Sequence, residues 1–492
     1  MNITEYLLEH GRNEQTAIIS GGISYSYSDL RRALGSFSVS LKSLDVQPGD
    51  RIGILASNSF FWITAYLAIM GLGGVAVPFA PVILPDTFRK HERFVHCKAI
   101  CIERRYFNKY ISVLPEKTPL IFDHQSSLLE SNRAPITVPI DEDQDAAFMF
   151  TSGTTALPRV VRVTHKNIRA NTESIITSLG LTSSERILAV LPFYYCFGTS
   201  LLHTHLRVGG TLILANNFVY PEIILDLMEQ TDCTAIAGVP STFQTLLRNT
   251  TFPKRTLPHL FKVQQAGGKL HEVLLKELID TLPQAEIFVM YGQTEATARL
   301  SCLPPEKLET KLGSIGKGIP GVELSVVNEF NQPVETGQVG EIIARGDNIS
   351  PGYLNDPQGT YEKFPGGVLH TGDIASVDMD GYITIVDRMS DFIKSQGYRI
   401  SSQEIEANVL TLTDIVSAAA VGEPDLAHGE AIHLFVTLRS SSQLNTNDIL
   451  AHCRRVLPRY MVPHKVDIIK RMPLNANGKI MKSQLKGYKV LE

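Results

Sequence analysis

The sequence predicts an α/β fold: a large N-terminal region with two mainly parallel α/β subdomains and a β-barrel-like subdomain, then a small α+β region. Three observations predict it. Up to about Gly313, short apolar runs alternate with longer amphipathic runs, which is typical of parallel sheets covered by helices. From Gly313 glycine and proline become dense between short strand-like runs, which indicates an antiparallel, barrel-like part. After Asp387 a shorter stretch mixes helix-like and strand-like runs.

Composition limits the classes of function. The chain has 492 residues, which suggests roughly three domains. Its net charge is −4, and a value so near zero argues against binding nucleic acid or an anionic membrane, since both require a basic surface. The six cysteines are few and scattered, and no signal-peptide pattern opens the chain. We therefore expect a cytoplasmic protein with reduced thiols.

The apolar runs give the elements of the N-terminal region in chain order. Strands are expected at 51–56, 74–78, 99–101, 186–191, 211–214, 235–239 and 286–290, and helices at 28–44, 58–70, 221–230, 241–248 and 272–282.

One stretch of this region raises the question of a membrane span. Residues 52–85 contain no Asp, Glu, Lys or Arg, and residues 60–84 are long enough to cross a bilayer. Three glycines (Gly71, Gly73 and Gly74) interrupt the run, and no basic cluster flanks it. We therefore expect a buried helix followed by a buried strand, and no membrane span.

The C-terminal elements form a separate set. Helices are expected at 403–410 and 447–456, and strands at 415–421 and 431–438. The change of pattern places a domain boundary after Asp387, with an N-terminal domain at 1–387 and a C-terminal domain at 388–492.

The most distinctive motif lies at residues 148–167, FMFTSGTTALPRVVRVTHKN. An apolar strand runs into a cluster of small hydroxylated residues around a glycine, and Thr164 can cap a following helix. Such a loop can wrap an anion, because glycine lets the backbone approach and the N–H groups and hydroxyls point inward. Taken alone, such a cluster is more often a polar turn between strands.

The loop resembles the phosphate-binding loop of the adenylate-forming superfamily. This superfamily includes acyl- and aryl-CoA synthetases, the adenylation domains of nonribosomal peptide synthetases, and firefly luciferase. Its other signatures follow in order, so the resemblance covers essentially the whole chain. It implies binding of ATP and Mg²⁺, with phosphate held by Thr151, Ser152, Gly153, Thr154, Thr155 and Arg159.

Two further signatures concern the nucleotide and the metal. Residues 291–295 (YGQTE) resemble the family's Tyr-Gly-x-Thr-Glu, which implies that Tyr291 packs on adenine beside Gly292, Thr294 touches phosphate and Glu295 helps to hold Mg²⁺. One carboxylate suits Mg²⁺, which completes its shell with phosphate and water. Gly267 and Gly268 resemble the glycine-rich strand end that borders adenine and the acyl pocket.

The last signatures lie near the domain boundary and the C-terminus. Asp373, in Thr-Gly-Asp, and Arg388 match the residues that hold the ribose hydroxyls. Residues 473–479 (PLNANGK) resemble the family's Pro-x-x-x-x-Gly-Lys, and Asn-Gly is a tight-turn signal. The resemblance implies that Lys479 enters the active site and bridges the carboxylate and the α-phosphate.

The chain departs from the family pattern in the phosphate loop. The usual Gly-x-Pro-Lys-Gly is here Ala156, Leu157, Pro158, Arg159 and Val160. Arg159 keeps the positive charge, but its planar guanidinium with several N–H donors replaces the compact ammonium of the family's lysine. Ala156 and Val160 lack the freedom of glycine, so we expect a stiffer loop.

Two other departures concern the acyl side and the hinge. Tyr195 stands where many relatives have His, and Ser390 stands at the hinge position that usually holds Asp or Lys. Neither change removes the residues that the chemistry most needs.

One difference from the family pattern suggests the class of acid that is activated. Amino-acid-activating relatives have an Asp at the position of Gly198, where it pairs with the α-ammonium. Burying that ammonium without a counter-ion would be costly, so a fatty or aromatic acid without an α-amine is favoured. The expected pocket residues are Tyr195, Phe197, Gly198, Gly238 and Gly268. We expect the glycines of this region to leave room for the acid: Gly198, Gly238, Gly267, Gly268 and Gly292.

Together these residues predict a two-step ligase. A carboxylic acid and Mg-ATP give an acyl-adenylate and pyrophosphate; the C-terminal domain then rotates about Ser390, bringing the face around Lys394 to a thiol that takes the acyl group. The residues assigned to catalysis are Thr151, Glu295, Lys394 and Lys479. The thiol is CoA or, in the alternative, the phosphopantetheine of a carrier protein. A nucleotide-binding homologue without turnover is a further alternative.

Overall fold

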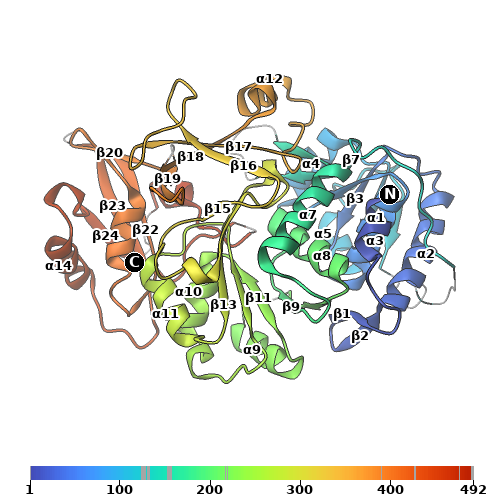
Figure 1. Ribbon diagram of the computed structural model, residues 1–492, viewed down its shortest axis with the longest axis horizontal. Coiled ribbons are helices and arrows are strands. Elements are labelled where there is room, and N and C mark those ends of the chain that lie inside the picture. The colour runs from blue at the N-terminus through green and yellow to red at the C-terminus, as the bar shows by residue number, and fades with distance from the viewer. Residues whose placement is uncertain are drawn as a thin grey trace.

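A computed structural model describes the chain at residues 2–123, 129, 133–151, 158–216, 218, 220–388, 391–425, 428–475 and 477–488, without the side chain of Arg388. Figure 1 shows a broad N-terminal body, with its earliest elements at the right, and a C-terminal unit at the left. The six cysteines are buried thiols, as the sequence predicts.

The first sheet follows the predicted alternation of strands and helices. Its strand order is β6-β5-β3-β4-β7-β8, and its neighbours are parallel except for the antiparallel pair β7–β8. The strands are β3 (Arg51–Leu55), β4 (Val75–Pro78), β5 (Ala99–Ile102), β6 (Leu120–Phe122), β7 (Asp145–Phe150) and β8 (Val160–Thr164). The residues of β4 and β5 are buried throughout, as expected of parallel strands covered on both faces.

The second sheet has nine strands in the order β15-β14-β13-β12-β11-β9-β10-β1-β2. Its central strands are parallel, and β2, β14 and β15 join antiparallel at the two edges. The strands are β1 (Thr16–Ser20), β2 (Ile23–Ser26), β9 (Arg186–Ala189), β10 (Thr211–Leu214), β11 (Ala235–Gly238), β12 (Lys262–Gln265), β13 (Glu286–Tyr291), β14 (Ser301–Leu303) and β15 (Lys317–Gly318).

Helices join the two sheets into one body. They are α1 (Ile3–Leu8), α2 (Tyr27–Ser43), α3 (Phe60–Gly71), α4 (Pro85–Val95), α5 (Arg104–Tyr110), α7 (His165–Leu179), α8 (Cys196–Val208), α9 (Pro221–Gln230), α10 (Pro240–Asn249), α11 (Glu272–Thr281) and α12 (Pro357–Lys363). Helix α3 packs on β3 and β4, α8 packs on β9 and β10, and α1 contacts α3, α7 and α8 (Figure 1). One apolar core therefore continues from the first sheet to the second.

The charge-free stretch lies in this core. Every residue of α3 is buried, and Ser59 caps the helix by accepting a hydrogen bond from the Trp62 N–H at 3.1 Å. The buried strand β4 follows, as predicted; only the end of the stretch, including Val82 and Leu84, reaches the surface. Among the described residues, none of the helices has the length and apolar character that crossing a bilayer requires.

The glycine-rich part after Gly313 contains an antiparallel sheet in the order β16-β17-β18-β19. Its strands are β16 (Val322–Val327), β17 (Val339–Gly346), β18 (Leu369–Val377) and β19 (Ile383–Arg388). The antiparallel prediction is confirmed, and within the described residues β16 and β19 form the two open edges of this sheet.

The C-terminal unit is α+β, as predicted. Its sheet has the order β21-β20-β23-β22, with β24 parallel to β23. The elements are β20 (Ile393–Ser395), β21 (Tyr398–Ile400), α13 (Ser402–Val409), β22 (Ile415–Asp425), β23 (Gly429–Leu438), α14 (Thr446–Val456), β24 (Lys465–Ile468) and α15 (Lys482–Leu485). The boundary after Asp387 stays a prediction.

A buried arginine of the body holds the C-terminal unit. The Arg248 guanidinium, on α10, donates to the backbone oxygens of Leu410 at 3.0 Å and Leu412 at 3.4 Å, and also to that of Ile415. Its side chain is 0% exposed and pairs with Glu277 on α11. The positive head thus satisfies three carbonyls at the end of α13 and the start of β22.

A second polar cluster lies at the same interface. Glu406, on α13, pairs with Lys482 at 2.8 Å and with His271 of the body at 3.7 Å. Burial alone would raise the pKa of Glu406, but Lys482 and His271 outweigh burial and hold this pKa below its usual range. The cluster links α13, α15 and the segment before α11.

We expect Arg248→Ala to loosen this interface. The change leaves three carbonyls without their donor in a buried place, which should lower the free energy of unfolding by about 3 kcal/mol. Urea denaturation measures the loss, and hydrogen exchange in α13 and β22 should accelerate. Arg89→Ala, at an exposed pair with Asp86, is the matched control and should change neither reading. Unchanged exchange in α13 and β22 would show that Arg248 does not hold the unit.

Candidate active site

The site is built around a hydrogen bond between two sheets. Tyr291 is the last residue of β13, and its hydroxyl donates to Asp373 Oδ2 at 2.6 Å in a buried setting. Asp373 lies in β18, where the Thr371 hydroxyl accepts from its N–H at 3.2 Å. The register of β18 and β19 aligns Asp373 with Arg388. The predicted adenine and ribose residues therefore come together at one point.

Glu295 lies in the short 3₁₀ turn after β13 (Thr294–Ala296). Its Oε1 accepts a hydrogen bond from the Tyr353 hydroxyl at 2.8 Å, and its backbone oxygen accepts from the Ser350 N–H at 2.9 Å. The Arg159 guanidinium lies 5.0 Å from the centre of the Tyr353 ring. Burial and the neighbouring Glu295 carboxylate raise the pKa of Tyr353 well above its ordinary value, so the hydroxyl stays a donor.

Tyr353 is a site residue that the sequence reasoning did not find. It stands in the run GDNISPGYLNDP, whose turn residues indicated only an antiparallel part. A tyrosine directly after a Pro-Gly turn is the one signal that could have marked it. Its role becomes visible only when β8 and the segment around Ser350 bring it to Glu295.

The donor set fits Mg²⁺ and a nucleotide. Mg²⁺ takes one or two protein carboxylates and fills its shell with phosphate oxygens and water, and the described residues hold no group of three or more possible ligands. Glu295 would hold the ion, which when bound would offset the negative charge of the phosphates. Gly267 has φ +84°, and a Cβ there would lie 2.8 Å from Val239 Cγ1.

The described ends of the phosphate loop close on each other. Thr151 follows β7, and its N–H donates to the backbone oxygen of Arg159 at 3.1 Å, just before β8. Thr164 caps α7 through a reciprocal box with Asn167, as the sequence predicts. The tip of the loop, with Ser152, Gly153, Thr154 and Thr155, lies outside the described residues, as does Ser390.

The acyl side is formed by the start of α8 and the ends of β11 and β12. A Cβ on Gly267 would lie 3.1 Å from the Tyr195 hydroxyl, and the rings of Tyr195 and Phe197 meet edge to face at 6.5 Å. Phe197 is buried. Tyr195 therefore faces the glycine strand end, as the resemblance implies.

The glycines do not all leave room for a substrate. A Cβ on Gly198 would lie 2.1 Å from the Pro192 backbone oxygen, so the expectation that Gly198 opens the pocket is wrong. Gly238 lies against Thr242 in the same way, at 2.9 Å, and a Cβ on Gly292 would meet the Ala298 oxygen at 1.8 Å. These glycines permit close backbone packing. Gly268 faces Pro240, 3.2 Å from the position of a Cβ.

The loop that carries Lys479 is docked on the body. The Ser241 hydroxyl donates to the backbone oxygen of Gly478 at 2.6 Å, and a Cβ on Gly478 would lie 3.1 Å from Val239 Cγ2. Within the loop, Asn475 Oδ1 accepts from the Lys479 N–H at 2.9 Å. The backbone of the Gly478–Lys479 turn therefore lies beside Val239 and Ser241, at the start of α10, and the side chains of both Lys479 and Lys394 on β20 are exposed.

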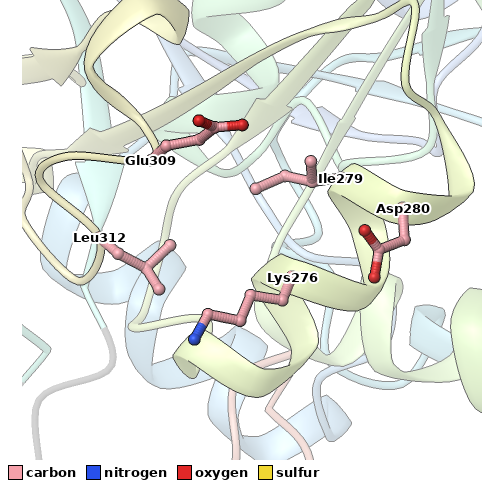
Figure 2. Close-up of a pocket in the computed structure, with 5 residues that line it drawn as sticks. All are labelled: Lys276, Ile279, Asp280, Glu309 and Leu312. Carbon is pink, nitrogen blue, oxygen red and sulfur yellow. The ribbon is translucent and has the colours of Figure 1, made fainter.

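A hollow of about 260 Å³ elsewhere on the body is not this site. Figure 2 shows Lys276, Ile279 and Asp280 of α11 facing Glu309 and Leu312 across it. Its charged side chains are exposed, and it contains none of the nucleotide, metal or acyl residues described above.

Comparisons with known proteins agree with this geometry. The family model of AMP-binding enzymes matches residues 9–354, and that of the AMP-binding enzyme C-terminal domain matches residues 404–479. The chain is 31% identical to 4-coumarate–CoA ligase 3 of Arabidopsis thaliana, covering 95% of this chain and 87% of the relative. It is 29% identical to feruloyl-CoA synthase of an Amycolatopsis species, covering 96% and 95%.

A solved structure is similar over the whole chain. The o-succinylbenzoate CoA synthetase of Bacillus subtilis, in complex with its acyl-adenylate intermediate, has a TM-score of 0.86 and 25% identity, covering 100% of this chain and 99% of that chain. The predicted fold and class of reaction are confirmed: ATP-dependent activation of a carboxylic acid, then thioester formation with CoA. The chain belongs to the AMP-binding enzyme family, as an AMP-forming acid–CoA ligase.

Proposed function

We propose that this ligase activates a fatty or aromatic carboxylic acid without an α-amine, at the site between Tyr291, Glu295, Asp373 and Lys479. The observation that carries the site is the docking of the Gly478–Lys479 turn on Ser241, since it brings the lysine to the body that holds the nucleotide residues. The acid class is supported by the absence of a counter-ion for an ammonium at Gly198.

In the first step a carboxylate oxygen attacks the α-phosphorus of ATP. The new bond joins that oxygen to phosphorus, the bond to the bridging oxygen breaks, and pyrophosphate leaves with both electrons. Asp373 and Arg388 hold the ribose, Tyr291 packs on adenine, and Thr151 and Arg159 hold the base of the phosphate loop. Lys479 stabilises the negative charge that develops between carboxylate and phosphate, a role that depends on position and charge alone.

In the second step the C-terminal domain, residues 388–492, rotates about Ser390 and the Lys394 face meets the thiol. The thiol loses its proton to solvent, its sulfur attacks the acyl carbon, and the bond between that carbon and the phosphate oxygen breaks, so that AMP leaves with the bonding electrons. The exposure of Lys394 supports this proposal, because a face used only after rotation must be accessible before it. A carrier-protein phosphopantetheine is the alternative acceptor, and the buried thiols support a cytoplasmic location.

An acid panel tests the proposal. The protein is incubated with Mg-ATP and fatty, aryl and amino acids, with and without CoA, and pyrophosphate and thioester are measured. We expect release with acids that lack an α-amine, and an acyl-CoA when CoA is present. Release with amino acids alone would overturn the acid class. Release without any thioester from CoA would favour the carrier-protein acceptor, and no release at all would indicate the homologue without turnover.

Lys479→Ala should separate the two steps. We expect loss of pyrophosphate release, because no other cation then reaches the transferred phosphorus from this loop, while thioester formation from synthetic acyl-AMP and CoA continues. Lys470→Ala, an exposed lysine of the same domain, is the control and should keep both activities. Adenylation that survives Lys479→Ala would refute the assigned role.

Tyr353→Phe should weaken the metal site without removing a ligand. The hydroxyl that orients Glu295 is lost, so we expect the Mg²⁺ concentration for half-maximal pyrophosphate release to rise about 10-fold. Titration with Mg²⁺ at saturating ATP measures the shift. Tyr361→Phe, on α12 and 74% exposed, is the matched control. An unchanged Mg²⁺ requirement in Tyr353→Phe would show that the Tyr353 hydroxyl does not contribute to Mg²⁺ binding.

A further inference from the structure

Arg299 is a buried cation behind the motif that holds Glu295. It is 1% exposed and one of the largest fully buried side chains in the described part of the protein. Its backbone is fixed: the Arg299 N–H donates to Asn171 Oδ1 at 3.2 Å, and its oxygen accepts from Asn171 Nδ2 at 2.9 Å and Asn348 Nδ2 at 3.0 Å. The guanidinium carbon lies 4.3 Å from the centre of the Phe197 ring. The side chain is therefore held in one place.

The head of Arg299 lacks the partners that a buried charge requires. Nε and Nη2 have no hydrogen-bond acceptor among the described residues. The groups that interact with the charge are the Cys302 and Cys196 thiols and the Tyr195 phenol, with no carboxylate among them. Burial lowers the pKa of Arg299 to about 10, so the group remains a cation at neutral pH. An unpaired buried cation is strongly unfavourable unless another molecule completes it.

The surroundings of Arg299 are those of the acyl side. Tyr195, Cys196 and Phe197 are consecutive residues at the start of α8; the guanidinium lies over the Phe197 ring and interacts electrostatically with the Cys196 thiol and the Tyr195 phenol. The Thr294 hydroxyl donates to Cys196 Sγ at 3.5 Å, which connects this place to the nucleotide motif. The Tyr195 hydroxyl adjoins Gly267, and Val239 lies between Gly267 and the docked Gly478. Val239, Gly267 and Tyr195 thus connect the docked Gly478–Lys479 turn with the surroundings of Arg299.

We propose that Arg299 binds a second carboxylate of the acid, so that this ligase activates dicarboxylic acids. The inference rests on the proposed function: one carboxylate reacts with ATP, and the other pairs with the guanidinium. A planar fork with two donors matches a carboxylate in geometry as well as charge. A monoacid of the same length would leave Arg299 unpaired beside its methyl end, at the full cost of a buried charge.

Matched pairs of acids test the wild-type enzyme. Straight-chain diacids are compared with monoacids of the same carbon number, and terephthalate with 4-methylbenzoate, by pyrophosphate release. We expect kcat/KM for the best diacid to exceed that of its matched monoacid about 100-fold or more. Turnover of monoacids at equal or greater kcat/KM in every pair would overturn the inference and leave the proposed function intact. No release with any acid would instead refute the proposed function.

Arg299→Met tests the residue. We expect a loss of about 100-fold in kcat/KM for the diacid, mostly through KM, with equal or better turnover of the monoacid. Arg299→Lys keeps the charge but loses the fork, so it should retain part of the preference. Arg169→Met, at a surface pair with Glu142, is the control and should not alter the ratio.

A purely structural role for Arg299 gives a different result. It predicts that Arg299→Met lowers the melting temperature and reduces turnover of both acids equally, which would overturn the proposal. Binding of a second carboxylate predicts a melting temperature that does not fall, because an unpaired buried charge has been removed. If Arg299→Met does not fold, the matched acids are compared with the wild-type enzyme and with Arg299→Lys instead. An unchanged preference of Arg299→Lys for the diacid would show that the paired N–H donors of the guanidinium do not bind the second carboxylate.

Discussion

The buried hydrogen bond from Tyr291 to Asp373 joins the sheet that contains β13 to the open antiparallel sheet that contains β18. The proposed nucleotide site depends on this contact. It fixes Tyr291 and Asp373 on one another, although 82 residues separate them in the chain. Glu295 follows directly after β13, and Tyr353 reaches it from the segment between β17 and β18, so the carboxylate proposed to hold Mg²⁺ is oriented where the same two sheets meet.

The C-terminal unit is held on the body by apolar and polar contacts together. An apolar cluster continues from the second sheet and its helices into this unit. Polar contacts lie beside it: Arg248 on three carbonyls, Glu406 with Lys482 and His271, and Ser241 on Gly478. Polar contacts of this kind can be exchanged for water at modest net cost.

Two buried arginines illustrate how burial and function are related. Arg248 and Arg299 are both almost inaccessible to water. Arg248 donates hydrogen bonds to backbone oxygens and forms an ion pair with Glu277, so its charge is compensated within the protein. Arg299 has a fixed backbone but unpaired Nε and Nη2, among thiols and aromatic rings. A compensated cation stabilises an interface, and an uncompensated cation in an acid-binding region selects the ligand that compensates it.

The sequence by itself determined the fold class, the order of elements, the burial of the charge-free stretch and the identity of the motif residues, because apolar periodicity and local turn chemistry are properties of short segments. It did not determine Tyr353 at Glu295, the packing of Gly198 on Pro192, the open form of the antiparallel sheet or the uncompensated charge of Arg299. These depend on contacts between segments far apart in the chain, where the presence or absence of a partner, and not the residue type, decides what a side chain does. Only the tertiary structure supplies or withholds that partner.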